Sequence, residues 1–275
     1  MVAYFKRQSN LFMLAGAVLT VLALMPFYRG WLSGQEFYMK AFYVALPAFV
    51  GVIIGRILAS RWANRKLQRL DEMLYQQADT ESFVRAFIPL VERAPKETAE
   101  YVNGRIKLAY AFEAEGEFEK SLELLNGLKP EELKIHSLAV SALLANQKMR
   151  DYLLMEAAGN AGLQLVSMKA LQETASGRAP ALATNLKECI RLAEVWLGFL
   201  EGMSCDSAYI AEEMKLAKNV IHKSEMQLLL AKMRLRQGKN EEAGELLRDL
   251  LESAPGLYAA DEARRILEGS FGGPD

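Results

Sequence analysis

The chain has 275 residues, of which 51% are hydrophobic and 24% are charged, and its formal net charge is −1. This balance excludes an intrinsically disordered chain, and two cysteines exclude a scaffold held together by disulfides. The charges are unevenly placed: residues 1–70 carry nine lysines and arginines against the single acid Glu36, and the remainder carries 24 against 33 acids. A basic, apolar head followed by an acidic body is not the pattern of one soluble globule.

Two apolar segments predict a transmembrane hairpin over residues 1–60. The first span covers about 11–28 and carries no charge, and the second covers about 41–60 with one charge, Arg56, near its end. At 1.5 Å per residue, each run approaches the roughly 30 Å thickness of the hydrocarbon core of a bilayer. A cleaved signal peptide is the alternative for the first run, but no small-x-small cleavage site follows it. A buried core helix is the alternative for the second.

Lysine and arginine are densest at the end of the second span and just after it, at Arg56, Arg61, Arg65, Lys66 and Arg69. Such a basic flank favours the cytoplasmic side of a membrane. We therefore expect a multi-pass protein of the inner (plasma) membrane, bound to the lipid bilayer. Its N-terminus and everything after residue 60 would be cytoplasmic, with a short loop around Trp31 outside.

A stripe of small residues, Gly51, Gly55 and Ala59, lies at four-residue spacing in the second span. Small residues at this spacing let another helix approach closely. The partner is either a second copy of the chain, which makes a homo-oligomer possible, or the chain's own first span. Because two spans joined by a short loop must pack together, we favour the first span.

After residue 60 the pattern is helical throughout, and no strand-type alternation is sustained. Residues 61–79 predict an amphipathic juxtamembrane helix with Trp62, Leu67 and Leu70 on its apolar face. Prolines then fall at spacings that suit turns between helices, at Pro95, Pro130, Pro180 and Pro255. Pro89 stands inside a helical pattern, and there it predicts a kink or a break.

Two stretches share a spacing of small, apolar and turn residues. In the first these residues are Leu108, Ala109, Phe112, Gly116, Phe118 and Ser121. In the second they are Leu230, Ala231, Gly238, Ala243 and Pro255. The spacing resembles the tetratricopeptide repeat (TPR), a 34-residue helix–turn–helix unit.

The resemblance implies an all-α protein in which residues 80–269 form a TPR-like α-solenoid of about five helical hairpins. A terminal helix over 258–267 would cap the solenoid, and 270–275 would be a flexible tail. Between the two copies we predict helix pairs at 138–146 with 151–158 and at 182–200 with 208–218. These pairs are either divergent repeats or another helical-hairpin solenoid.

No pattern of catalytic, metal-binding or cofactor-binding residues occurs. His136, His222, Cys189 and Cys205 are isolated, and no phosphate-binding glycine motif is present. The acids between Glu113 and Glu123 predict a solvated helix face. The acidic body argues against nucleic acid as a partner. We therefore expect no catalytic residues, no metal, no cofactor and no enzyme activity.

The TPR-like alignment places one set of side chains on the concave surface, where members of that family bind peptides. The set consists of Asn103, Ile106, Tyr110, Glu113, Lys232 and Arg236. The surface would be either a binding groove for a protein or peptide or a packing surface for neighbouring helices.

We therefore expect a membrane-anchored adaptor or scaffold that binds a protein partner at the cytoplasmic face. The alternative is an accessory subunit of a membrane transporter or secretion complex, in which the transmembrane hairpin carries the specificity.

Overall fold

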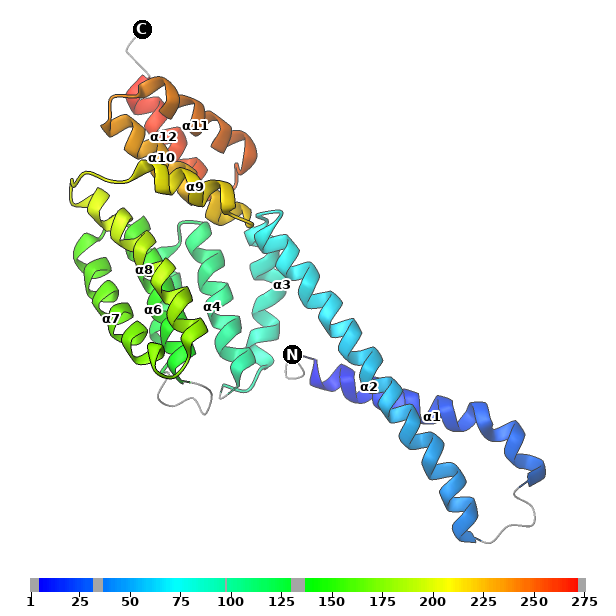
Figure 1. Ribbon diagram of the computed structural model, residues 1–275. Coiled ribbons are helices and arrows are strands. Elements are labelled where there is room, and N and C mark those ends of the chain that lie inside the picture. Colours follow the sequence, from blue (N-terminus) through cyan, green and yellow to red (C-terminus); the bar gives the residue numbers. More distant parts are fainter. Residues whose placement is uncertain (1–4, 32–36, 97, 130–136, 272–275) are drawn as a thin grey trace. The chain divides into compact units, whose positions relative to one another are not determined.

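The computed structural model describes residues 5–31, 37–96, 98–129 and 137–271, and these residues form only helices and their connections (Figure 1). The all-α prediction is confirmed for them. The chain divides into two compact units, one made of residues 1–70 with 92–95 and the other of 71–91 with 96–275.

The first unit contains two long apolar helices, α1 (Lys6–Trp31) and most of α2 (Phe37–Tyr75). Their apolar stretches, Arg7–Met25 and Ala41–Tyr75, have the length and composition needed to cross a membrane. Large apolar side chains stand exposed along both helices, among them Leu14, Leu19, Phe42, Phe49 and Ile53. A core helix of a soluble protein would bury such side chains.

Glycines form the contact between α1 and α2. A Cβ added at Gly51 would overlap the carbonyl oxygen of Gly16 and would lie 2.6 Å from Oγ1 of Thr20. A Cβ added at Gly55 would lie 2.8 Å from Cα of Met13. The stripe of small residues therefore faces the chain's own first helix within this unit.

The stretch predicted as a separate juxtamembrane helix, 61–79, instead continues α2 without interruption to Tyr75. Neither glycine nor proline stands between Gly55 and Tyr75, so nothing in the backbone ends the helix where the side chains change from apolar to basic. Trp62 packs edge-to-face on Phe5, with 5.1 Å between ring centres. The chain turns only at Ala78, whose φ is +53°.

Helix α3 (Thr80–Arg93) contains Pro89 and still runs through it, so of the predicted kink or break the break does not occur. Proline removes one backbone hydrogen bond and costs about 3 kcal/mol in a helix interior. On the apolar side of α3, however, Phe83, Phe87 and Val91 are at most 2% exposed. Burial of three such side chains at roughly 1.5–3 kcal/mol each exceeds that cost.

The remaining helices of the second unit are α4 (Ala99–Ala114), α5 (Phe118–Asn126), α6 (Ser137–Leu154), α7 (Ala158–Ser176), α8 (Pro180–Leu200), α9 (Ser207–Leu216), α10 (Val220–Arg236), α11 (Asn240–Ser253) and α12 (Tyr258–Phe271). Helices adjacent in sequence pack together from α4 to α8 and again from α9 to α12, and α4, α6 and α8 also pack in turn (Figure 1). The series of neighbouring helices that pack on each other is interrupted at residues 201–206, since α9 packs mainly on α10, the helix that follows it.

Helix α12 packs on α10 and α11 and also reaches α4. Its first residue, Tyr258, meets the ring of Phe118 edge-to-face at 4.9 Å between ring centres. The same ring lies against Gly116, where an added Cβ would come within 2.8 Å of it. The last helix therefore packs on the turn between α4 and α5.

Four helices of this unit end in the same left-handed turn. Gly116 and Gly238, predicted from sequence as turn glycines, have φ of +80° and +74°, and Gly202 has φ of +82°. Glu156 adopts this conformation too, with φ of +56°. At all four turns, the amide of the next residue bonds a carbonyl five residues back, at Phe112, Tyr152, Gly198 or Arg234.

The turn at Glu156 explains why one predicted helix pair is wrong. Residues 138–146 and 151–158 were expected to form two helices, but α6 runs from Ser137 to Leu154 and the turn falls at 155–157. No glycine marks this turn, and no helix-breaking residue stands at 147–150. At the C-terminus, α12 continues to Phe271, so residues 270 and 271 of the predicted tail are helical.

Replacing Glu156 with glycine is expected to stabilise the second unit by about 0.5–1 kcal/mol, because glycine accepts positive φ without steric cost. The ion pair between Glu156 and Lys232 would be lost, but Lys232 keeps Glu262 at 3.0 Å. Urea denaturation of the full-length protein in detergent measures the change. The matched control, Glu156→Gln, loses only the ion pair. If it stabilises the protein as much as Glu156→Gly does, the gain does not come from relief of the positive φ.

Candidate functional site

A buried arginine on α6 joins two other helices of the second unit. One Nη of Arg150 lies 2.9 Å from Oε1 of Glu113 on α4 and 2.7 Å from Oε2 of Glu225 on α10. The side chains of Glu113, Glu225 and Arg150 are 0%, 5% and 18% exposed. Since charges withdrawn from water are costly unless paired, this triad holds α4, α6 and α10 in one arrangement.

A second group of polar side chains surrounds Glu113. Gln147 donates to Oε2 of Glu113, and the hydroxyl of Ser121 donates to Oδ2 of Asp151 at 2.7 Å. Oδ1 of Asp151 is buried without a donor among the described residues, and its carboxyl is within hydrogen-bonding reach of Glu113. A proton shared between these two carboxyls would satisfy that oxygen.

Tyr110, on α4, connects the triad to the start of α10. The Arg150 guanidinium carbon lies 5.0 Å from the centre of its ring, and Asn219 donates to its hydroxyl at 3.0 Å. The Asn219 side chain also caps α10 by accepting from the amide of His222 at 2.8 Å. Nδ1 of His222 lies 3.6 Å from Oε2 of Glu225, so the first turn of α10 contributes to the same site.

Burial and nearby charges shift the pKa values of the three carboxyls in this network in different directions. Burial raises the pKa of Glu113 well above its ordinary value, against the opposing effect of Arg150. Burial also disfavours ionisation of Glu225, but Arg150 and His222 outweigh it and lower the pKa of Glu225. Burial raises the pKa of Asp151 to about 6, although hydrogen bonds from Glu113 and Ser121 act against it. Burial thus raises the pKa of two of the three carboxyls, whereas the nearby cation lowers that of the third.

The raised pKa of Asp151 has a measurable consequence for stability. Because the unfolded carboxyl titrates near 3.9, the folded state binds more protons between about pH 4 and pH 6, and stability falls as pH rises through that range. The free energy of unfolding of Asp151→Asn, taken relative to that of the wild type, is therefore expected to rise by about 2 kcal/mol between pH 4 and pH 7. Urea denaturation of the full-length protein across this range measures the difference. Asp249→Asn, at an exposed position, is the control. If the difference in stability between Asp151→Asn and the wild type does not change with pH, the pKa of Asp151 is not raised.

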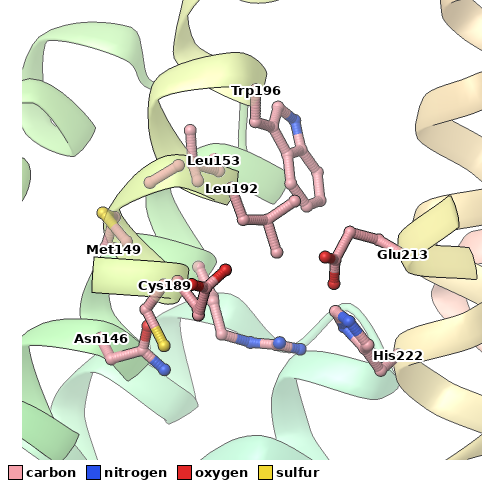
Figure 2. Close-up of a pocket in the computed structure, with 11 residues that line it drawn as sticks. Asn146, Met149, Leu153, Cys189, Leu192, Trp196, Glu213 and His222 are labelled. Atoms are coloured by element: carbon pink, nitrogen blue, oxygen red, sulfur yellow. The ribbon is translucent and has the colours of Figure 1, made fainter. Parts of the chain in front are cut away.

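A pocket of about 180 Å3 opens beside the triad, between α6, α8, α9 and the start of α10 (Figure 2). Its apolar wall comes from Met149, Leu153, Leu192, Ala193 and Trp196, and its polar lining from Asn146, Arg150, Glu188, Cys189, Glu213 and His222. In Figure 2, Glu213 and His222 lie on one side, and Asn146, Met149 and Cys189 on the other. The volume is comparable to apolar cavities that hold a benzene molecule, so the pocket has room for one side chain.

The six side chains predicted to line a groove make contacts in several different places within the second unit. Tyr110 and Glu113 meet at the triad, where Glu113 is fully buried and not part of a solvated face. Ile106 packs in a small core with Val102 and Leu125, and Asn103 is exposed.

The two predicted groove residues on α10 make other contacts. Lys232 bonds Glu156 and Glu262 at 2.8 and 3.0 Å, which ties α10 to the turn before α7 and to α12. The guanidinium carbon of Arg236 lies 3.8 Å from the ring centre of Phe199, and Arg236 donates to the carbonyl of that residue.

Within the part of the chain that the structure describes, no group of three or more His, Cys, Asp or Glu side chains is arranged to hold a metal ion. Cys189 and Cys205 are free thiols. His136 lies outside the described residues. No family model, curated protein or solved structure matches the chain.

Proposed function

We propose that this protein is a membrane-anchored adaptor whose TPR-like helical domain binds a protein partner at the cytoplasmic face of the inner membrane. The pocket between α6, α8 and α9 carries the proposal: it combines an apolar wall with charged groups, as single-side-chain recognition requires. The Arg150 triad supports it by fixing α6 and α10, two of the helices that line the pocket.

The anchor is supported by α1 and α2. Both are long and apolar enough to span a bilayer, and their large apolar side chains point outward, with Leu14 63% and Phe49 64% exposed. The basic residues at the end of the second predicted span, 41–60, and just after it favour a cytoplasmic helical domain. An adaptor confined to a membrane meets its partner at raised effective concentration, so a small pocket is sufficient for recognition.

An accessory subunit that recognises its complex through Gly51 and Gly55 is less well supported. Gly16, Phe12 and Met13 of α1 already fill the space in front of both glycines. A partner helix would have to displace α1 to reach them, whereas the pocket is open.

Site-specific photocrosslinking in cells tests the adaptor function. A photoreactive residue at Leu192, in the pocket wall, is expected to capture a discrete partner from the membrane fraction. The same residue at Glu252, exposed on α11 and away from the pocket, serves as the control. Absence of a specific adduct from Leu192 would contradict the adaptor function. A cysteine introduced at Ser33 should react with impermeant reagents in intact cells if the orientation is as proposed.

A further inference from the structure

The pocket beside Arg150 has an excess of negative charge. Arg150 directs its guanidinium to Glu113 and Glu225, so its charge is compensated within the triad. Glu188 and Glu213 also line the pocket, and neither forms an ion pair among the described side chains. By contrast, Glu194 and Glu212 on the same two helices are paired with Lys169 and Lys215.

Other charged groups near the pocket do not change this balance. His222 lies 3.6 Å from Glu225. Arg191, one turn after Glu188 on α8, stacks over Tyr209 with its guanidinium carbon 4.3 Å from the ring centre, and it does not line the pocket. Tyr209 hydrogen-bonds Glu213 but brings no positive charge, so the two carboxylates have no ion-pair partner among the described side chains before a guest binds.

The apolar wall suits the aliphatic part of a long basic side chain. Leu153, Leu192 and Trp196 line one continuous pocket with the two glutamates. Lysine and arginine place an apolar stem on such a surface while the charged end meets anionic groups, and an indole ring also attracts cations. The pocket has room for one side chain and not for a helix.

Taking the proposed function as its basis, we propose that the pocket receives a lysine or arginine side chain of the protein partner. Its stem lies along Leu192 and Trp196, and its cation lies between Glu188 and Glu213. The partner therefore presents a basic segment to the acidic body of this protein.

The test uses full-length protein in lipid nanodiscs with 13C-labelled methionine methyl groups. The Met149 signal, identified through Met149→Leu, reports occupancy of the pocket. Three probes are titrated: Nα-acetyl-lysine methylamide, its uncharged norleucine analogue and its anionic glutamate analogue. The lysine probe is expected to bind with a millimolar dissociation constant, about five- to thirtyfold tighter than norleucine, since one ion pair at a partly exposed site supplies roughly 1–2 kcal/mol.

Variants assign the preference to the two glutamates. Glu188→Gln with Glu213→Gln should abolish the preference for lysine over norleucine, while Glu194→Gln with Glu212→Gln, which changes charge equally on the same helices, should keep it. Equal binding of all three probes, preference for the anion, or no binding at 50 mM would overturn the proposal. Micromolar binding of free butylamine would also overturn it, because the pocket would then serve a small amine.

The probe titration and the photocrosslinking test of the adaptor function can fail independently of each other. A crosslinked partner at Leu192 without preference for lysine refutes the basic side chain alone. A preference for lysine without any crosslinked partner refutes the adaptor alone.

Discussion

Arg150→Met is expected to destabilise the helical domain by about 3–5 kcal/mol, because it leaves Glu113 and Glu225 buried without their shared cation. Methionine retains most of the apolar stem, so the loss reports charge rather than packing. Urea denaturation of the full-length protein in detergent, followed by circular dichroism, measures the change at pH 7.

A compensating variant separates charge from structure. Arg150→Met combined with Glu113→Gln and Glu225→Gln removes the cation and both carboxyl groups, and it should recover more than half of the loss, because neutral amides cost less to bury than carboxylates without a cation. If Arg150→Met alone costs less than 1 kcal/mol, the triad does not hold the three helices together. Arg178→Met, an exposed arginine on the turn after α7, is the control and should change stability by less than about 0.5 kcal/mol.

Gly51→Leu is expected to separate α1 from α2, because a Cβ at this position overlaps the backbone carbonyl of Gly16 and no flexible side chain can yield. Helices α1 and α2 must then move apart along their whole contact, which includes Thr20 on α1 and Gly55 on α2. Cysteines placed at Phe12 and Trp62, whose rings are 6.0 Å apart between centres, report the separation. Crosslinking with a short bismaleimide, in a background without Cys189 and Cys205, should fall at least about fivefold.

Ala45→Leu is the size-matched control for this substitution, since Ala45 is exposed on the same helix. It should leave crosslinking unchanged. Retention of crosslinking in Gly51→Leu would mean that α1 does not occupy the face of the glycines. That face would then be free for another helix, as the accessory-subunit alternative requires.

Local sequence patterns were sufficient to predict the helical character of the chain and two of the turns, but not every helix boundary. The apolar stretches of α1 and α2 have the length of spans, and Gly116 and Gly238 mark turns because only glycine adopts positive φ at low cost. The turn at Glu156 was missed for the same reason, since glutamate there carries no such signal. Its geometry is imposed by the packing of α6 on α7, which overrides local preference.

The triad could not be predicted from local patterns. Arg150 and Glu225 are 75 residues apart in the sequence, so no local spacing links the two side chains. Acids near Glu113 suggested a solvated face, yet Glu113 is fully buried. A weak signal existed: Glu225 stands in the run Ser224–Leu230, among side chains that are almost all apolar or uncharged. A lone acid in such a run indicates a buried partner, but not which one.

The attachment of the whole chain to a membrane is the claim on which the adaptor function depends. Cells expressing the full-length protein are lysed without detergent, and the membranes are washed with alkaline carbonate, which releases peripheral proteins. The protein is expected to remain in the membrane pellet and to become soluble only when detergent is added. Recovery of the intact chain in the carbonate supernatant would contradict the account.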